Sequence, residues 1–228
     1  MNERVYEMKP LSKYVDHTTL KPFGTKEMVE QFCAAAIAND FASVCINPCD
    51  IALAKSLLAG TEIKVCTVIG FPLGRNLTSI KVAETEAAYE LGCDEFDMVI
   101  NVGKLKDGEY DYVRDEIAAV VKAAKGRLVK VIIETGLLTD DEKVIATKLS
   151  CEAGAGYVKT CSGVSAGVAT VEDVALMKAN CTNGVKVKAS SGIRCYEDAK
   201  KLIDAGAERL GTSAGIAILE GAKAAGDL

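Results

Sequence analysis

The chain has 228 residues, of which 49% are hydrophobic and 26% are charged. This length is enough for one sizeable hydrophobic core, and single α/β barrels commonly occupy about 250 residues. The net charge of −5 and the aromatic content of 5% argue against a nucleic-acid-binding protein, which usually has a basic surface and aromatic platforms for bases. No apolar run approaches the roughly 18 residues of a membrane span, and no signal peptide is recognised.

The cysteines and the histidine content bear on metals and on the cellular compartment. There are nine cysteines at irregular spacing, without a Cys-x-x-Cys pair, and His17 is the only histidine. Zinc sites are usually built from such pairs and from histidines, so we expect no metal and no other cofactor. Many reduced thiols are typical of a cytosolic protein, and we therefore expect a cytoplasmic location.

Eight short apolar segments alternate along the chain with segments of helical spacing. This repetition predicts a parallel sheet that is covered by helices on its outer face. Eight strands favour closure into a (β/α)8 TIM barrel over an open doubly wound sheet, the alternative. We expect one domain over 1–228, with a short helical extension at about 1–13. The predicted strands are 14–18, 42–46, 63–69, 95–100, 128–133, 156–160, 185–189 and 209–212.

Two of the predicted strands carry lysines in apolar surroundings. Strand alternation places Lys159 of strand 156–160, and both Lys186 and Lys188 of strand 185–189, on the inner face of a barrel. A lone buried charge costs several kcal/mol unless it is paired or lost. An uncharged lysine can form a Schiff base with a carbonyl, and adjacent strands would bring Lys159 and Lys188 together. The alternative is an ordinary lysine whose head reaches solvent.

Acidic residues accompany these lysines. Asp97 shares a face of its predicted strand with Glu95, and the face is the inner one if Phe96 packs under the helices. An inward carboxylate could balance the lysines and transfer protons, or it could be a structural counter-ion only. Asp16 could join the same cluster, whereas His17 is expected to be structural.

Turns rich in glycine and serine follow the sixth, seventh and eighth predicted strands. Small residues allow backbone N–H groups to approach an anion, and the last two loops of such barrels commonly bind phosphate. Each turn could also be a turn only. The candidate phosphate-binding residues are Ser162, Gly163, Ser191, Gly192, Ser213 and Ala214.

Eight segments, in order along nearly the whole chain, resemble the deoxyribose-phosphate aldolase family. They are DHTTLKP (16–22), FASVCINP (41–48), VCTVIGFPLG (65–74), FDMVINVG (96–103), KVIIET (130–135), YVKT (157–160), VKAS (187–190) and RLGTSAG (209–215). The chain departs from the family pattern at Ser191, where glycine is usual, and at Ala214, where serine is usual.

The resemblance implies a class I aldolase that cleaves 2-deoxy-D-ribose 5-phosphate reversibly to glyceraldehyde 3-phosphate and acetaldehyde. It implies that Lys159 forms the Schiff base, that Asp97 and Lys188 transfer protons with support from Asp16, and that Cys45 lies near the aldehyde pocket. It further implies small phosphosugar and aldehyde substrates, and a homo-oligomer that is a dimer or a tetramer.

Two other classes of function remain open on the same fold, because a barrel alone does not fix an activity. A phosphosugar isomerase or epimerase would need an acid/base pair, and often a metal, in place of a nucleophilic lysine. A non-catalytic barrel would bind its ligand without forming a covalent adduct.

Overall fold

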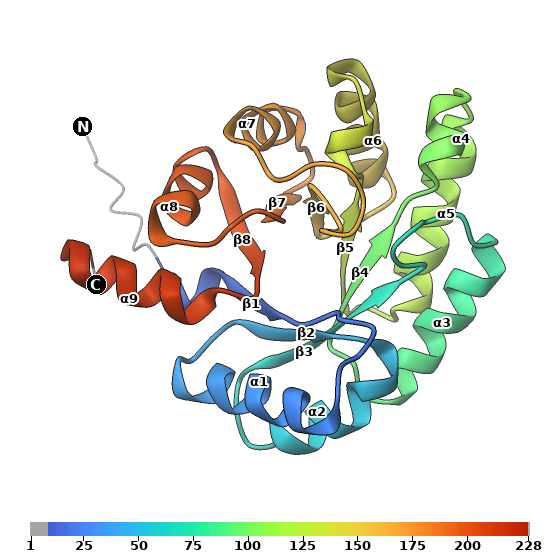
Figure 1. Cartoon of the computed structure of the whole chain (residues 1–228). Coiled ribbons are helices and arrows are strands. Elements are labelled where there is room, and N and C mark those ends of the chain that lie inside the picture. Colours follow the sequence, from blue (N-terminus) through green and yellow to red (C-terminus); the bar gives the residue numbers. More distant parts are fainter. Residues whose placement is uncertain (1–8, 228) are drawn as a thin grey trace.

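The structure is a computed structural model that describes residues 9–227. Within these residues eight parallel strands follow one another in chain order and close into a barrel, because the last strand pairs with the first. Helices surround the barrel (Figure 1). This is the single-domain (β/α)8 barrel predicted from the sequence. The strands are β1 (Val15–Thr18), β2 (Ser43–Ile46), β3 (Lys64–Ile69), β4 (Glu95–Val99), β5 (Leu128–Ile132), β6 (Tyr157–Lys159), β7 (Lys186–Ser190) and β8 (Ala207–Thr212).

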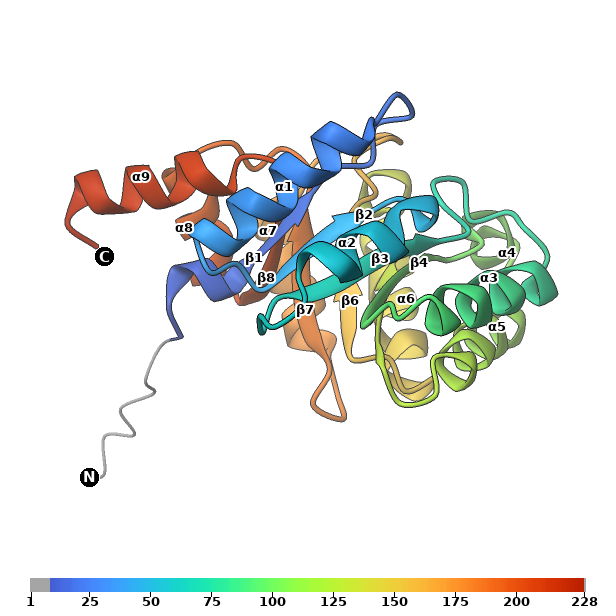
Figure 2. The same cartoon turned by 90° about the horizontal axis from the view of Figure 1, so that it is seen from below.

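The helices lie between successive strands and cover the outside of the barrel; α1 and α2, for example, pack over β1, β2 and β3 (Figure 2). Side-chain caps fix several helix starts. A capping box between Thr139 and Glu142 opens α6, and the Thr170 hydroxyl accepts the N–H of Asp173 at 3.0 Å to open α7. The helices are α1 (Lys26–Ala38), α2 (Ile51–Leu57), α3 (Thr78–Glu90), α4 (Val102–Lys106), α5 (Tyr110–Ala123), α6 (Asp140–Glu152), α7 (Val171–Asn180), α8 (Tyr196–Asp204) and α9 (Gly215–Ala225), with 3-10 turns η1 (Leu11–Tyr14), η2 (Pro48–Asp50) and η3 (Thr135–Leu137).

The apolar core lies between the outer face of the barrel and the helices. Val44, Met98 and Val158 belong to this core and are fully buried. The neighbouring positions along the same strands point into the barrel, because successive side chains of a strand alternate between its faces. The inner positions are largely polar, and they include Asp97 and Lys130. Apolar side chains on the outer face of the strands therefore build the core, and polar side chains on the inner face line the inside of the barrel.

The predicted strand limits agree with the observed ones to within two residues. Tyr14 belongs to η1 and not to the first strand, and β8 begins at Ala207, two residues earlier than predicted. Most of the extension expected at about 1–13 lies outside the described residues. Across residues 9–227, no helix combines the length and the apolar character needed to cross a membrane.

Candidate active site

A cluster of seven buried charged side chains fills the inside of the barrel. It contains three carboxylates and four basic groups, and none of the seven residues is more than 9% exposed. Six of the eight strands contribute, so the cluster depends on the closed barrel. The members of this charged cluster are Asp16 on β1, Glu95 and Asp97 on β4, Lys130 on β5, Lys159 on β6, Lys188 on β7 and Arg209 on β8.

Asp97 is the centre of the charged cluster. Its Oδ2 accepts hydrogen bonds from the Nζ of Lys159 at 2.8 Å and from the Nζ of Lys188 at 2.7 Å. Its Oδ1 accepts a hydrogen bond from the Nζ of Lys130 at 2.8 Å. Lys159 and Lys188 are paired residues in the register of β6 and β7, which explains why they reach the same oxygen atom.

Asp16 makes the contacts on the other side of the charged cluster. Its Oδ1 accepts hydrogen bonds from the Ser43 hydroxyl at 2.6 Å and from the Nε of Arg209 at 2.7 Å. Its Oδ2 lies 2.5 Å from the Nζ of Lys188 but, among residues 9–227, has no well-aligned hydrogen-bond donor, so this contact is ionic rather than directional. Glu95 completes the cluster, because it contacts Lys130 at 2.7 Å and Arg209 at 2.8 Å.

The ion pairs fix the protonation states of these groups against the effect of burial. Burial raises the pKa of Asp97, but the lysines in contact with it outweigh burial and hold this pKa well below its usual value. The pKa of Asp16 is lowered for the same reason, through Arg209 and Lys188. Burial lowers the pKa of Lys188 and of Lys130, but the neighbouring carboxylates outweigh it and raise both values. At neutral pH both aspartates are therefore ionised and both of these lysines protonated.

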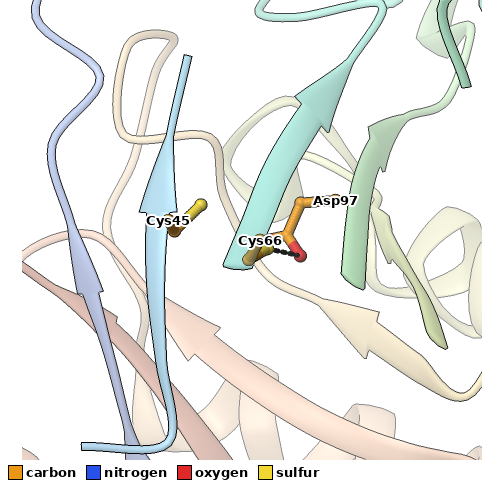
Figure 3. Close-up of side chains that lie close together, drawn as sticks. All are labelled: Cys45, Cys66 and Asp97. Carbon is orange, nitrogen blue, oxygen red and sulfur yellow. Dashed lines mark hydrogen bonds between the residues drawn. The ribbon is translucent and has the colours of Figure 1, made fainter. Parts of the chain in front are cut away.

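Two thiols lie beside Asp97. The Sγ atoms of Cys45 on β2 and Cys66 on β3 and a carboxylate oxygen of Asp97 lie within 4.8 Å of one another (Figure 3). Cys66 donates a hydrogen bond to Asp97 at 3.3 Å, and burial raises the pKa of the Cys66 thiol well above its usual value. Cys45 and Cys66 form a small apolar cluster with Val68, and Leu20 and Phe71 pack against this cluster, which makes this wall of the site apolar.

Two thiolates and a carboxylate are ligands that suit a zinc-like cation. Here both oxygens of Asp97 already bind lysines, and Cys66 lies 3.2 Å from the ammonium group of Lys130. A metal ion would therefore meet three lysines next to its ligands and would first need the loss of a proton from Cys66. This arrangement suits a small organic substrate better than a metal.

A cleft of about 510 Å³ opens above the C-terminal ends of β6, β7 and β8. The candidate phosphate-binding residues Ser162, Gly163, Ser191, Gly192 and Ser213 line it, whereas Ala214 is not among the lining residues. Lys21 and Arg194 also line the cleft, and the sequence analysis did not select them. Neither forms an ion pair with a described residue, so both cations are available to an anion.

Several groups in these turns are already used within the protein. The backbone N–H of Ser162 donates to Glu134, and the Ser162 hydroxyl accepts the N–H groups of Val164 and Ser165 at 3.1 and 3.3 Å. The N–H of Ala214 donates to the hydroxyl of Thr212 at 2.9 Å. Ser162 therefore shapes its loop, and Ala214 is the N-cap of α9 without a side-chain cap.

Comparison with known proteins identifies the family. The family model described as DeoC/LacD family aldolase matches residues 11–221. The chain belongs to this aldolase family. A protein named deoxyribose-phosphate aldolase from Streptococcus suis (strain 98HAH33) is 57% identical over 217 residues, which cover 95% of this chain and 99% of that protein. A protein of the same name from Brevibacillus brevis (strain 47) is 54% identical over 216 residues, which cover 95% of this chain and 98% of that protein.

Solved structures of the same family superpose closely on the barrel. The crystal structure of a putative deoxyribose-phosphate aldolase from Coccidioides immitis gives a TM-score of 0.92 at 42% identity, and the match covers 93% of this chain and 86% of that one. A tetrameric deoxyribose phosphate aldolase from Aeropyrum pernix gives a TM-score of 0.88 at 32% identity, over 94% of this chain and 92% of that one.

The structure brings together the residues that sequence reasoning selected as catalytic and supporting. Lys159, Asp97, Lys188 and Asp16 are linked by direct contacts, and Cys45 lies within 4.8 Å of the Asp97 carboxylate. Their roles in a reaction remain predictions. His17 lies outside the cluster, stacked on Phe32 with ring centroids 4.4 Å apart, and burial lowers its pKa to about 4.

The expectation that Lys186 points into the barrel was wrong. Lys186 is the first residue of β7, so its side chain leaves the barrel at the N-terminal rim, is half exposed and contacts Glu208 at 3.4 Å. The sequence analysis also missed Lys130 and Arg209, and it assigned no role to Glu95. Strand alternation would have placed Lys130 next to Asp97, since the two are paired in the register of β4 and β5.

Proposed function

We propose that this chain is a deoxyribose-phosphate aldolase that cleaves 2-deoxy-D-ribose 5-phosphate to glyceraldehyde 3-phosphate and acetaldehyde through a Schiff base on Lys159. The family and the names of its relatives support the reaction. The charged cluster supports the assignment of the nucleophile.

The observation that carries the assignment is the imbalance of charge. Four basic groups face three carboxylates in the cluster, so full protonation would leave one buried positive charge unbalanced, which is unfavourable where water is excluded. Lys130, Lys188 and Arg209 each contact at least two of the carboxylates, whereas Lys159, within the described part of the chain, contacts Asp97 alone. Removing a proton from Lys159 therefore breaks the fewest ion pairs and leaves the cluster neutral.

The mechanism follows from these protonation states. The uncharged amine of Lys159 adds to the C1 carbonyl of the open-chain sugar, and loss of water gives an iminium ion. The C3 hydroxyl then loses its proton while the C2–C3 bond breaks, and the electron pair of this bond becomes the enamine at C2. Glyceraldehyde 3-phosphate leaves. Protonation of C2 and hydrolysis of the iminium release acetaldehyde and regenerate Lys159.

Asp97 and Lys188 form the proton-transfer pair in this scheme. Asp97 is ionised and accepts protons, and Lys188 is protonated and donates them. Because Lys159 and Lys188 bind the same Oδ2 atom, a proton that leaves one amine can return through the other without crossing the apolar wall. Asp16 keeps Lys188 protonated and in place, and Cys45 lies on the aldehyde side of the site.

The cleft above the cluster would receive the phosphate group. Arg194 and Lys21 supply positive charge, and Gly163 and Gly192 supply N–H groups. The proposal includes a homo-oligomer, on the ground of the tetrameric Aeropyrum pernix relative, and a cytoplasmic location, on the ground of nine free cysteines.

Reductive trapping tests the proposal. Incubation with acetaldehyde and borohydride should add one ethyl group, and peptide mapping should locate it at Lys159. The variant Lys159→Ala should lose the adduct, whereas Lys186→Ala, which removes a half-exposed lysine from the opposite rim, should keep it. A wild-type protein that cleaves the sugar phosphate without any adduct would refute the Schiff-base mechanism and favour metal- or base-dependent chemistry.

A further inference from the structure

Glu134 is a buried glutamate just beyond β5 that the mechanism above does not use. It is 2% exposed and has a left-handed backbone conformation, with φ 58° and ψ 61°. Residues other than glycine, asparagine and aspartate seldom adopt this conformation, and it persists only where the surroundings impose it. Such positions concentrate at functional sites.

One oxygen of Glu134 holds the loop between β6 and α7. Its Oε1 accepts the backbone N–H of Ser162, and the Ser162 hydroxyl in turn orders the next N–H groups of the loop. The two segments also touch directly. A Cβ atom on Gly136 would lie 2.4 Å from the carbonyl oxygen of Ala166, so only glycine permits this approach. The loop shape therefore depends on the segment that begins at Glu134.

The other oxygen of Glu134 is unused. Its Oε2 is buried and has no hydrogen-bond partner among residues 9–227. The titratable groups around the carboxyl are Lys159 on β6 and the thiol of Cys161 at the start of the loop. Burial raises the pKa of Glu134, and the hydrogen bond from the backbone N–H of Ser162 and the charge of Lys159 oppose that effect only in part.

Glu134 lies next to the cleft that is proposed to receive the phosphate group. Ser162 and Gly163 line the cleft, and the carboxyl of Glu134 is hydrogen-bonded to the first of them. An ionised carboxylate there would repel a bound phosphate dianion, while a neutral carboxyl can still accept the N–H of Ser162 through its carbonyl oxygen and carry its proton on Oε2. Binding of a dianion would then favour the protonated form.

We propose that Glu134 is a positioning residue for the anion-binding loop between β6 and α7, and that it takes up a proton from solution when a phosphate monoester binds to that loop. The inference rests on the proposed function, which places the phosphate of the substrate at this loop. Affinity for the phosphate group is thereby coupled to pH through a residue that does not contact the reacting carbonyl.

Calorimetry tests the coupling with glycerol 3-phosphate, a phosphate monoester without a carbonyl group. Binding is measured from pH 6 to 8, in buffers that differ in ionisation enthalpy, so that proton uptake is obtained directly. The wild type should take up more protons than the titration of the ligand itself explains. Glu134→Gln, which keeps an acceptor for Ser162, should lose that excess and show a weaker pH dependence of affinity. The control Glu172→Gln, an exposed glutamate on α7, should behave as the wild type.

The positioning role is tested by Glu134→Ala, which also removes the acceptor. We expect its affinity for glycerol 3-phosphate to fall about tenfold below that of Glu134→Gln at pH 6, because the buried N–H of Ser162 loses its hydrogen-bond acceptor. Thermal melts establish that each variant is folded. A wild type without excess proton uptake would overturn the coupling, and equal affinities of the Ala and Gln variants would overturn the positioning role. Trapping of acetaldehyde by the wild type separates either result from a failure of the proposed function.

Discussion

The charge of Lys188 should control how readily Lys159 reacts at neutral pH. Both amines bind the same oxygen of Asp97, at 2.8 and 2.7 Å, so they lie at most about 5.5 Å apart. With an effective dielectric constant of about 20, two positive charges at that separation repel by about 3 kcal/mol. Replacing Lys188 by leucine removes this repulsion, so the positive charge of Lys159 is no longer disfavoured by it and forming the reactive uncharged amine costs about 3 kcal/mol more than in the wild type.

The assay is the rate of ethyl-adduct formation with acetaldehyde and cyanoborohydride between pH 5 and 10. In Lys188→Leu the rate at pH 7 should fall about 100-fold. Lys188→Arg keeps the charge and should keep the wild-type profile. A leucine variant that is folded and reacts at pH 7 as fast as the wild type would show that the charge of Lys188 does not favour the uncharged amine of Lys159.

Three further results are expected. Because the pKa of Asp97 is lowered in the folded protein, its ion pairs stabilise the fold fully above about pH 4 and this stabilisation is lost progressively as the pH falls further, so Asp97 should lower the free energy of unfolding from urea titrations by about 1 kcal/mol between pH 6 and pH 3; an unchanged value would contradict the ion pairing. Lys130→Met should destabilise the protein by about 3–5 kcal/mol in the same titrations, because it leaves two buried carboxylates short of a cation, while Lys186→Met at the exposed rim should change stability by less than about 0.5 kcal/mol. Arg194→Gln should raise the KM for 2-deoxyribose 5-phosphate about tenfold and leave adduct formation with acetaldehyde unaffected; equal losses in both assays would place Arg194 elsewhere in the mechanism.

The barrel and the residues at its centre were predictable because successive side chains of a strand point alternately to its two faces. The eight apolar segments appear where they were expected, and Lys159, Lys188 and Asp97 point inward as the period of two requires. The sequence alone also identified the turns that line the cleft. These features depend only on local pattern and on chain order.

The wrong and missed assignments concern residues whose position depends on three-dimensional geometry and not on the local sequence pattern. Lys186 and Lys188 share a face, but alternation does not say where along the barrel axis a residue lies, and Lys186 is at the exposed rim. Arg209 begins the predicted strand 209–212, which is too short for its pattern to assign a face; in the structure its neighbour Leu210 packs in the outer core and Arg209 points inward to Asp16. The role of Glu134 depends on a left-handed backbone conformation and on a hydrogen bond from Ser162, 28 residues away. The local sequence pattern predicts neither of these features.

The contact between Asp16 and Arg209 joins the first strand of the barrel to the last one. During synthesis β1 leaves the ribosome long before β8 does, so the nascent chain carries Asp16 for most of its elongation without its guanidinium partner. A chain that stops before residue 209 keeps Lys159, Asp97 and Lys188 yet lacks the cation that neutralises Asp16 and Glu95. Enzyme activity in this protein should therefore appear only once translation is nearly complete, and it can report in cells on how many chains have closed their barrel.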